Sequence, residues 1–90
     1  MWLGKAAPNP MRGSTAIRFG LPQAVRVDLA VYDQAGRRVR QLASGPMSAG
    51  EYSVAWDARD NVGRALPSGL YFYRLQTELG TLAGSIVVLR

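Results

Sequence analysis

Apolar and polar side chains alternate along much of this chain. The segment 25–32 reads Val-Arg-Val-Asp-Leu-Ala-Val-Tyr, so its odd-numbered positions are all aliphatic. Successive side chains of a β-strand point to opposite faces, so this period of two predicts a strand with one buried and one solvated face. The same period recurs in the segments 15–21, 52–56 and 71–76. A shorter run at 38–42 and a more uniformly apolar segment at 82–89, expected to lie centrally or to be covered on both faces, complete six strands.

Turn-forming residues separate these segments. Clusters of Gly, Pro, Asp, Asn and Ser fall between the expected strands, at 33–36, 44–46, 48–50, 60–63, 67–69 and 78–80. No segment shows a helical stripe, and glycine is frequent, at 10 of 90 residues. Short strands joined by such turns are typical of an antiparallel sandwich or barrel. We expect an all-β fold, an Ig-like antiparallel β-sandwich of about six or seven strands.

The inward phase of each expected strand defines the predicted core. Trp56, Tyr71 and Tyr73 share that phase with aliphatic residues, and a large aromatic side chain needs an interior to bury its area. For Trp56, a sugar-stacking surface is the minor alternative. The predicted core residues are Ile17, Phe19, Val27, Leu29, Val31, Val54, Trp56, Tyr71, Tyr73 and Leu75.

Residues 1–13 differ from the rest. They contain Pro8 and Pro10, each of which restricts the preceding residue to extended geometry. We expect an extended lead-in or edge strand at 1–13, which could also join the domain to an upstream segment, and the sandwich itself at 14–90. The first residues lack the apolar stretch of a secretory signal, and no apolar run is long enough for a transmembrane segment.

Two turns share the pattern Asp-x-x-Gly-Arg-x-apolar. It occurs at 33–39 and again at 60–66. An Asp at the first position accepts hydrogen bonds from nearby backbone N–H groups, and a Gly three residues later takes the left-handed conformation. The predicted turn residues are therefore Asp33, Gly36, Asp60 and Gly63, with a duplicated ligand loop as the minor alternative.

The composition excludes several classes of catalytic and metal-binding site. The chain has neither Cys nor His, which excludes disulfides, thiolate or imidazole metal sites, Cys nucleophiles and a His general base. No serine has an imidazole partner, and no pair of carboxylates stands out as general acid and base. We expect no enzyme activity and no cofactor. Asp57, Asp60 and Asn61 offer oxygens for a calcium ion, but Arg59 and Arg64 oppose a cation there, so turn capping is favoured.

The 11 basic residues outnumber the 6 acidic ones, giving a net charge of +5. The arginines are spread over every segment and are not interleaved with aromatics on one face, so no specific nucleic acid is expected. Weak attraction to anionic polymers is the alternative. Phe72 lies on an outward strand position and is a candidate contact residue. The candidate interaction surface comprises Phe72, Arg37, Arg38, Arg40 and Arg90.

An ordered set of short motifs spans residues 8–90. It consists of Pro8-Asn9-Pro10, Thr15 to Pro22, Val31-Tyr32-Asp33 followed by Gly36-Arg37, Ala49 to Tyr52, Trp56 to Arg64 and Ser68 to Leu75. In this order the chain resembles the FlgD-type Ig-like domain, which is related to the C-terminal sorting domains of type IX secretion. The resemblance implies a small β-sandwich from the C-terminal end of a larger secreted or cell-surface bacterial protein.

The expected function is a non-catalytic accessory domain acting in sorting, anchoring or protein–protein assembly. Its partner would be a protein of the secretion or envelope-assembly machinery, or a second copy of itself. Edge strands and the C-terminal segment from Gly84 to Arg90 are the expected recognition elements, because an exposed edge offers unpaired backbone groups. The alternatives are a self-assembling structural subunit or hook-cap-like module, with 1–13 adding a strand to a neighbour, and a carbohydrate- or calcium-binding module.

Overall fold

The computed structural model describes all residues, from Met1 to Arg90, and contains no helix. Seven strands have six residues or more, and an eighth has two. They are β1 (Trp2–Leu3), β2 (Ala7–Arg12), β3 (Ser14–Leu21), β4 (Val25–Tyr32), β5 (Arg38–Met47), β6 (Gly50–Trp56), β7 (Gly69–Thr77) and β8 (Gly80–Val88). The prediction of an all-β sandwich is confirmed. No helix that could span a membrane is found.

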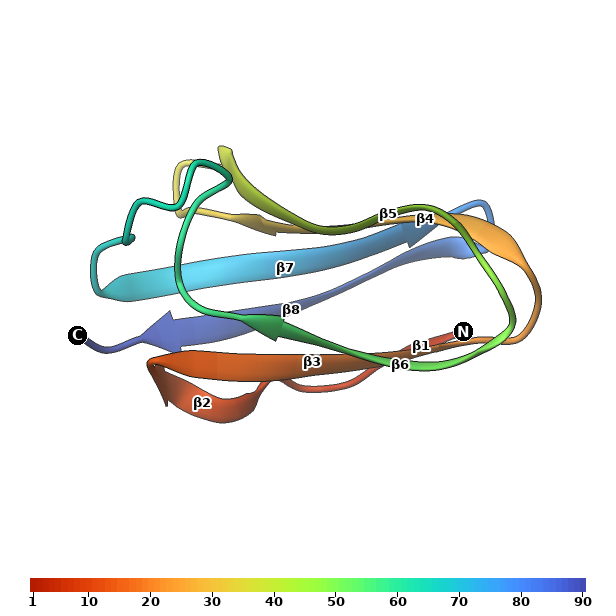
Figure 1. Cartoon of the computed structure of the whole chain (residues 1–90), viewed down its shortest axis with the longest axis horizontal. Helices are drawn as coiled ribbons and strands as arrows, with labels where there is room; N and C mark the ends of the chain where they lie inside the picture. Colours follow the sequence, from red (N-terminus) through yellow and green to blue (C-terminus); the bar gives the residue numbers. More distant parts are fainter.

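The strands form two layers that face each other (Figure 1). In one layer β3 pairs with β6 on one side and with β1 and β2 on the other. In the other layer the order is β8-β7-β4-β5, all antiparallel. Strand β2 also pairs in parallel with β8 and so joins the two layers along one side of the sandwich. On the other side the layers end at two edge strands, β5 and β6.

The interior is filled by the side chains that share the inward phase of each strand. All the predicted core residues are buried except Val54, which is partly buried and packs against the others. Trp56 is only 1% exposed and meets Tyr71 edge to face, with ring centroids 5.6 Å apart. An indole this deeply buried offers no surface for stacking on a sugar. Met11, Ile86 and Val88 also belong to the core, although the sequence pattern did not single them out.

Residues 1–13 are built into this sandwich. The Met11 side chain is fully buried, and the Tyr73 hydroxyl accepts a hydrogen bond from Ala6 N at 3.0 Å and donates one to Gly4 O at 2.8 Å. The Trp2 ring lies against Gly20 and leaves no room there for a Cβ. The segment expected as a lead-in thus shares its core with 14–90, and β2 lies between two other strands.

Asn9 explains how a strand with two prolines pairs with β8. The two prolines that flank it have no N–H group to donate to a neighbouring strand. The Asn9 side-chain amide supplies both kinds of group: Nδ2 donates to Ser85 O at 3.0 Å, and Oδ1 accepts from Val87 N at 2.9 Å. The main chain of β8 at these positions is therefore occupied. The C-terminal strand, expected as a recognition edge, lies between β7 and β2.

Candidate functional site

Two loops meet at one end of the sandwich, together with the C-terminus (Figure 1). They are the β4–β5 turn, residues 33–37, and the long connection from β6 to β7, residues 57–68. A cleft of about 700 Å³ is lined by both of them and by the start of β7. Because this cleft is bordered by the two Asp-x-x-Gly-Arg turns, we take this end as the candidate functional site.

The first turn is organised by the carboxylate of Asp33. Its Oδ1 accepts hydrogen bonds from Ala35 N at 3.0 Å and Arg37 N at 2.9 Å, and its Oδ2 accepts one from Arg37 Nε at 2.8 Å. Gly36 has a φ of 83°, in the left-handed region that glycine adopts without a steric penalty. The turn is thus closed by its own residues.

The second turn repeats this arrangement around Asp60. Oδ1 accepts from Val62 N at 3.1 Å and Arg64 N at 2.9 Å, and Oδ2 accepts from Arg64 Nε at 3.2 Å. Gly63 has a φ of 86°. The shared sequence pattern therefore corresponds to one shared set of bonds and one shared backbone conformation.

These bonds hold both carboxyl groups in the ionised form. The backbone N–H of Arg37 is the main cause that lowers the pKa of Asp33, and the backbone N–H of Arg64 does the same for the pKa of Asp60. Each carboxylate points into its own turn, with side-chain exposures of 16% and 17%. The paired guanidinium groups point outward, and the side chains of Arg37 and Arg64 are each 80% exposed.

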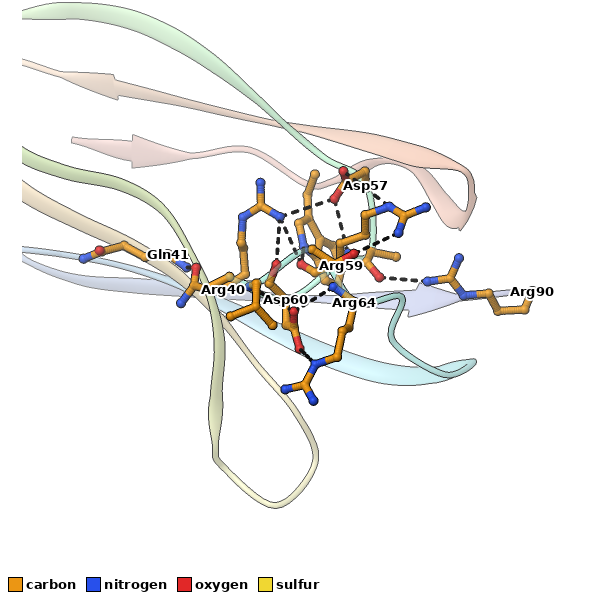
Figure 2. Close-up of polar contacts among 12 residues, drawn as sticks. Arg40, Gln41, Asp57, Arg59, Asp60, Arg64 and Arg90 are labelled. Carbon is orange, nitrogen blue, oxygen red and sulfur yellow. Dashed lines mark hydrogen bonds and ion pairs between the residues drawn. The ribbon is translucent and has the colours of Figure 1, made fainter.

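Strand β5 attaches the second turn to the sandwich. Two bulges shift its pairing with β4, so that Arg38 lies opposite Tyr32 and Arg40 lies opposite the inward-facing Val31. Arg40 Nη1 therefore reaches across the sandwich to Asp57 Oδ1 at 3.4 Å and to the carbonyl oxygen of Arg59 at 3.2 Å. Figure 2 shows these contacts from Arg40 to the connection.

Asn61 completes the attachment to β5. Its Oδ1 accepts a hydrogen bond from Gln41 N at 3.0 Å, and its own N–H donates to Val39 O at 3.1 Å. The connection thus adds a short line of pairing to the free edge of β5.

The C-terminal residue holds the connection from another side (Figure 2). Arg90 Nη2 donates to Ala58 O at 2.8 Å, and Arg90 Nε donates to Leu66 O at 2.7 Å. Trp56 Nε1 donates to Arg59 O at 3.1 Å, which ties the same segment to the core. These donors satisfy carbonyl groups that a strand would otherwise pair, so a connection without regular structure is fixed in place.

The oxygens considered for calcium are engaged by N–H donors. Asp57 Oδ1 accepts from Arg59 N and Arg40 Nη1, Asn61 Oδ1 accepts from Gln41 N, and the Asp60 carboxylate closes its turn. No cluster of three or more His, Cys, Asp or Glu side chains suited to a metal ion is present. The arrangement matches turn capping.

With this geometry, the chain can be compared with known proteins. The family model of the FlgD Ig-like domain matches residues 7–80. The chain belongs to the FlgD Ig-like domain family. No curated protein matches it.

Solved structures show the same fold. The structure of FlgD from P. aeruginosa is similar with a TM-score of 0.65 and 28% identity, covering 82% of this chain and 61% of that one. Dimeric latent PorU from Porphyromonas gingivalis has a TM-score of 0.67 and 23% identity, covering 93% of this chain and 9% of that one.

PorZ of the same organism, described as an essential bacterial surface component of the type-IX secretion system, has a TM-score of 0.66 and 24% identity, with coverages of 94% and 11%. At such identities, PorU and PorZ show the shared fold alone. In all three comparisons this FlgD Ig-like domain spans less than two thirds of the other chain.

This FlgD Ig-like domain does not bring its five candidate interaction residues onto one surface. Phe72 is 41% exposed on the outer face of β7, away from the cleft. Arg38 pairs with Asp28, while Arg40 and Arg90 are committed to the 57–68 connection. Of the five, only Arg37 lines the cleft with Nη atoms that have no hydrogen-bond partner.

Arg64 is the matching residue, named from the sequence only as a charge opposing a cation. It lines the same cleft as Arg37, and its guanidinium has the same single anchor, the Nε bond to the Asp of its turn. The repeated Asp-x-x-Gly-Arg pattern was the available signal, because it predicts that both arginines leave their turns in the same way.

Proposed function

We propose that this FlgD Ig-like domain is a non-catalytic accessory domain of a larger secreted or cell-surface bacterial protein. It attaches that protein to a protein of the secretion or envelope-assembly machinery. The observation that carries the proposal is the family match over residues 7–80, together with a fold shared with PorU and PorZ, in which the matching region is about a tenth of a long chain.

The construction of the loop end supports this proposal. The connection 57–68 is fixed by Arg40, Asn61 and Arg90, and no buried side-chain nitrogen or oxygen lacks a hydrogen-bond partner. A surface whose loops are already ordered loses little conformational entropy when a partner binds. Such a surface suits recognition by a protein partner.

An export assay tests the sorting role. The domain is fused to the C-terminus of a periplasmic reporter in a bacterium with an active type IX system, and surface and medium fractions are assayed. We expect the reporter outside the cell only when both the domain and the secretion system are present. A Trp56→Ser fusion, which loses the core aromatic, serves as the misfolded control. Reporter that stays in the periplasm with the folded domain would contradict the sorting role.

A second candidate function is self-association, favoured by the difference between the two edge strands. Strand β5 carries Pro46, two bulges and two arginines, which are features that block edge pairing. Strand β6 pairs with β3 in unbroken register from Gly50 to Trp56 and has a single charged residue, Glu51. Such an edge can template a strand from a second copy.

Light scattering tests self-association. The double variant Ser53→Lys/Ala55→Lys puts charges on two exposed outward positions of β6, where two copies would oppose like charges. If the domain self-associates through β6, the variant is monomeric at concentrations where the wild type is not. Gln76→Lys on the central strand β7 is the control. Deleting 1–13 is uninformative here, because it would remove Met11 from the core.

A further inference from the structure

The cleft at the loop end carries two guanidinium groups in matched positions. Arg37 and Arg64 both line it, and in each the Nε atom is held by the Asp of its own turn. The terminal Nη atoms of both side chains have no hydrogen-bond partner in the molecule. Each arginine is therefore fixed at one atom and presents its outer N–H groups to whatever occupies the cleft.

The acidic residues of the cleft do not cancel this charge for a ligand. Asp33 and Asp60 are largely covered and accept hydrogen bonds from inside their turns, whereas the arginine side chains are exposed. An approaching group meets guanidinium, not carboxylate. Guanidinium groups bind carboxylates with two parallel N–H···O bonds, which makes them selective for this planar anion.

The remaining lining is partly apolar. Val62 is 73% exposed at the tip of the second turn, and Leu66, Leu70 and Pro67 line the cleft beside it. Tyr71 is the only aromatic lining residue; it is buried, and its hydroxyl donates to Pro67 O at 2.7 Å. The cleft therefore lacks the exposed stacking surface that single-stranded nucleic acid uses.

We propose that the cleft between the two Asp-x-x-Gly-Arg turns binds an extended acidic peptide segment of a partner protein, with Arg37 and Arg64 each holding one side-chain carboxylate. Intervening apolar side chains of the peptide rest on Val62 and its apolar neighbours. A volume of about 700 Å³ is sufficient for a few residues of such a segment. This inference rests on the proposed function and names the chemistry of the partner.

Peptide binding by fluorescence anisotropy tests the proposal. The probe is a labelled dodecapeptide that alternates Glu with Leu and Val, and the comparison peptide has Gln in place of every Glu. We expect saturable binding of the Glu peptide by the full 90-residue chain and at least about tenfold weaker binding of the Gln peptide. Equal binding of the two peptides, or none, would overturn the proposal.

Matched charge variants locate the site. Arg37→Gln/Arg64→Gln removes two charges from the cleft, and Arg12→Gln/Arg26→Gln removes two exposed charges elsewhere. We expect the cleft pair to weaken binding at least about tenfold and the control pair less than about twofold, measured at two salt concentrations. An equal loss in both pairs would show attraction by net charge alone and would sink the proposal.

Two further arms separate other outcomes. Thermal melting of the cleft variant checks folding, and Arg37→Lys/Arg64→Lys keeps the charge but not the planar fork, so it should bind more weakly than wild type while remaining folded. The second arm measures binding of a single-stranded thymidine dodecamer, dT12. If dT12 binds more tightly than the Glu peptide, the cleft prefers nucleic acid and the proposal is contradicted. Normal reporter export by the Arg37→Gln/Arg64→Gln domain would overturn this inference while leaving the sorting role intact.

Discussion

The turns at 33–37 and 60–64 close with the same hydrogen bonds, yet they join the sandwich in different ways. The first links β4 to β5, which are themselves paired, so the strands on either side hold it in place. The second lies within a connection between the two layers, from β6 to β7, and only one isolated pair, Arg59 with Ala65, brackets it. Its position depends on Arg40 and Arg90, which lie outside the connection, and on the bond from Asn61 to Gln41 of β5.

Closing each turn and placing it on the sandwich are therefore two separate physical problems. The geometry within each turn is local, because an Asp, a Gly and an Arg within five residues supply every bond that closes it. The placement of the second turn is not local, because its partners lie about 20 residues away in β5 and at the end of the chain. Substitutions of the Asp or Gly that closes each turn should therefore have equal effects, whereas substitutions of the attachments should affect the second turn alone.

The largest effect is expected at the turn glycines. In Gly36→Val and Gly63→Val a β-branched residue must take a φ near +85°, as at the native 83° and 86°. Nothing lies within 4 Å of an added Cβ at either position, so the penalty is conformational. We expect each variant to lose about 2 kcal/mol of unfolding free energy, measured by urea denaturation. A large difference between the two would mean that the turns are not equivalent.

Arg40 and Arg37 give the next contrast. Arg40→Met keeps the length of the side chain but removes the bonds to Asp57 and to the carbonyl oxygen of Arg59. We expect a loss of about 1.5 kcal/mol. Arg37→Met removes only an exposed ion pair within its turn, and the loss should stay below about 0.5 kcal/mol. Chemical denaturation of both variants measures the difference, and equal losses would show that the Arg40 contacts contribute no more stability than an exposed ion pair.

The second residue of each turn offers a smaller, closely matched test. Asn61→Ala leaves Gln41 N of β5 without its acceptor, and we expect this to cost about 1 kcal/mol. Gln34 holds the same position in the first turn, is exposed and makes no hydrogen bond, so Gln34→Ala should be nearly neutral. Hydrogen exchange gives a local readout: the Gln41 amide should lose protection only in Asn61→Ala. Unchanged protection there would contradict the role given to Asn61.

The comparison also shows how much of this fold the sequence predicts. Alternation identified β3, β4, β6 and β7 and the core side chains that they carry, because one face of each of these strands is solvated. The turn geometry followed from two five-residue segments. Both signals are local, so no knowledge of distant neighbours was needed.

Features that rest on distant pairing were not predictable in this way. With Pro8 and Pro10 in β2, the sequence does not show that this strand pairs with β8. The pairing depends on the Asn9 side chain, which bonds to residues more than 70 positions away. The bulges of β5 leave no period in its sequence, so nothing indicated that Arg40 turns toward the opposite layer. The roles of Arg40 and Arg90 as attachments appear only when the layers are assembled.

The smallest effect, and the last test of equivalence, concerns pH. The pKa values of Asp33 and Asp60 are lowered in the folded protein, so the folded state binds fewer protons than the unfolded state as the medium becomes acidic. The stability that each ionised carboxylate contributes is complete above the unfolded pKa of about 4 and is lost as the pH falls through the folded pKa.

Asp33→Asn and Asp60→Asn keep an oxygen that accepts the backbone N–H bonds but carry no charge. Each should be less stable than wild type at neutral pH, and the difference should shrink below about pH 4, as measured by denaturation across a pH series. Plotted against pH, the stability losses of Asp33→Asn and Asp60→Asn should coincide, since the pKa values of Asp33 and Asp60 are lowered by the same causes. A difference that stays constant to the lowest pH would mean that the ionised carboxylates do not stabilise the turns.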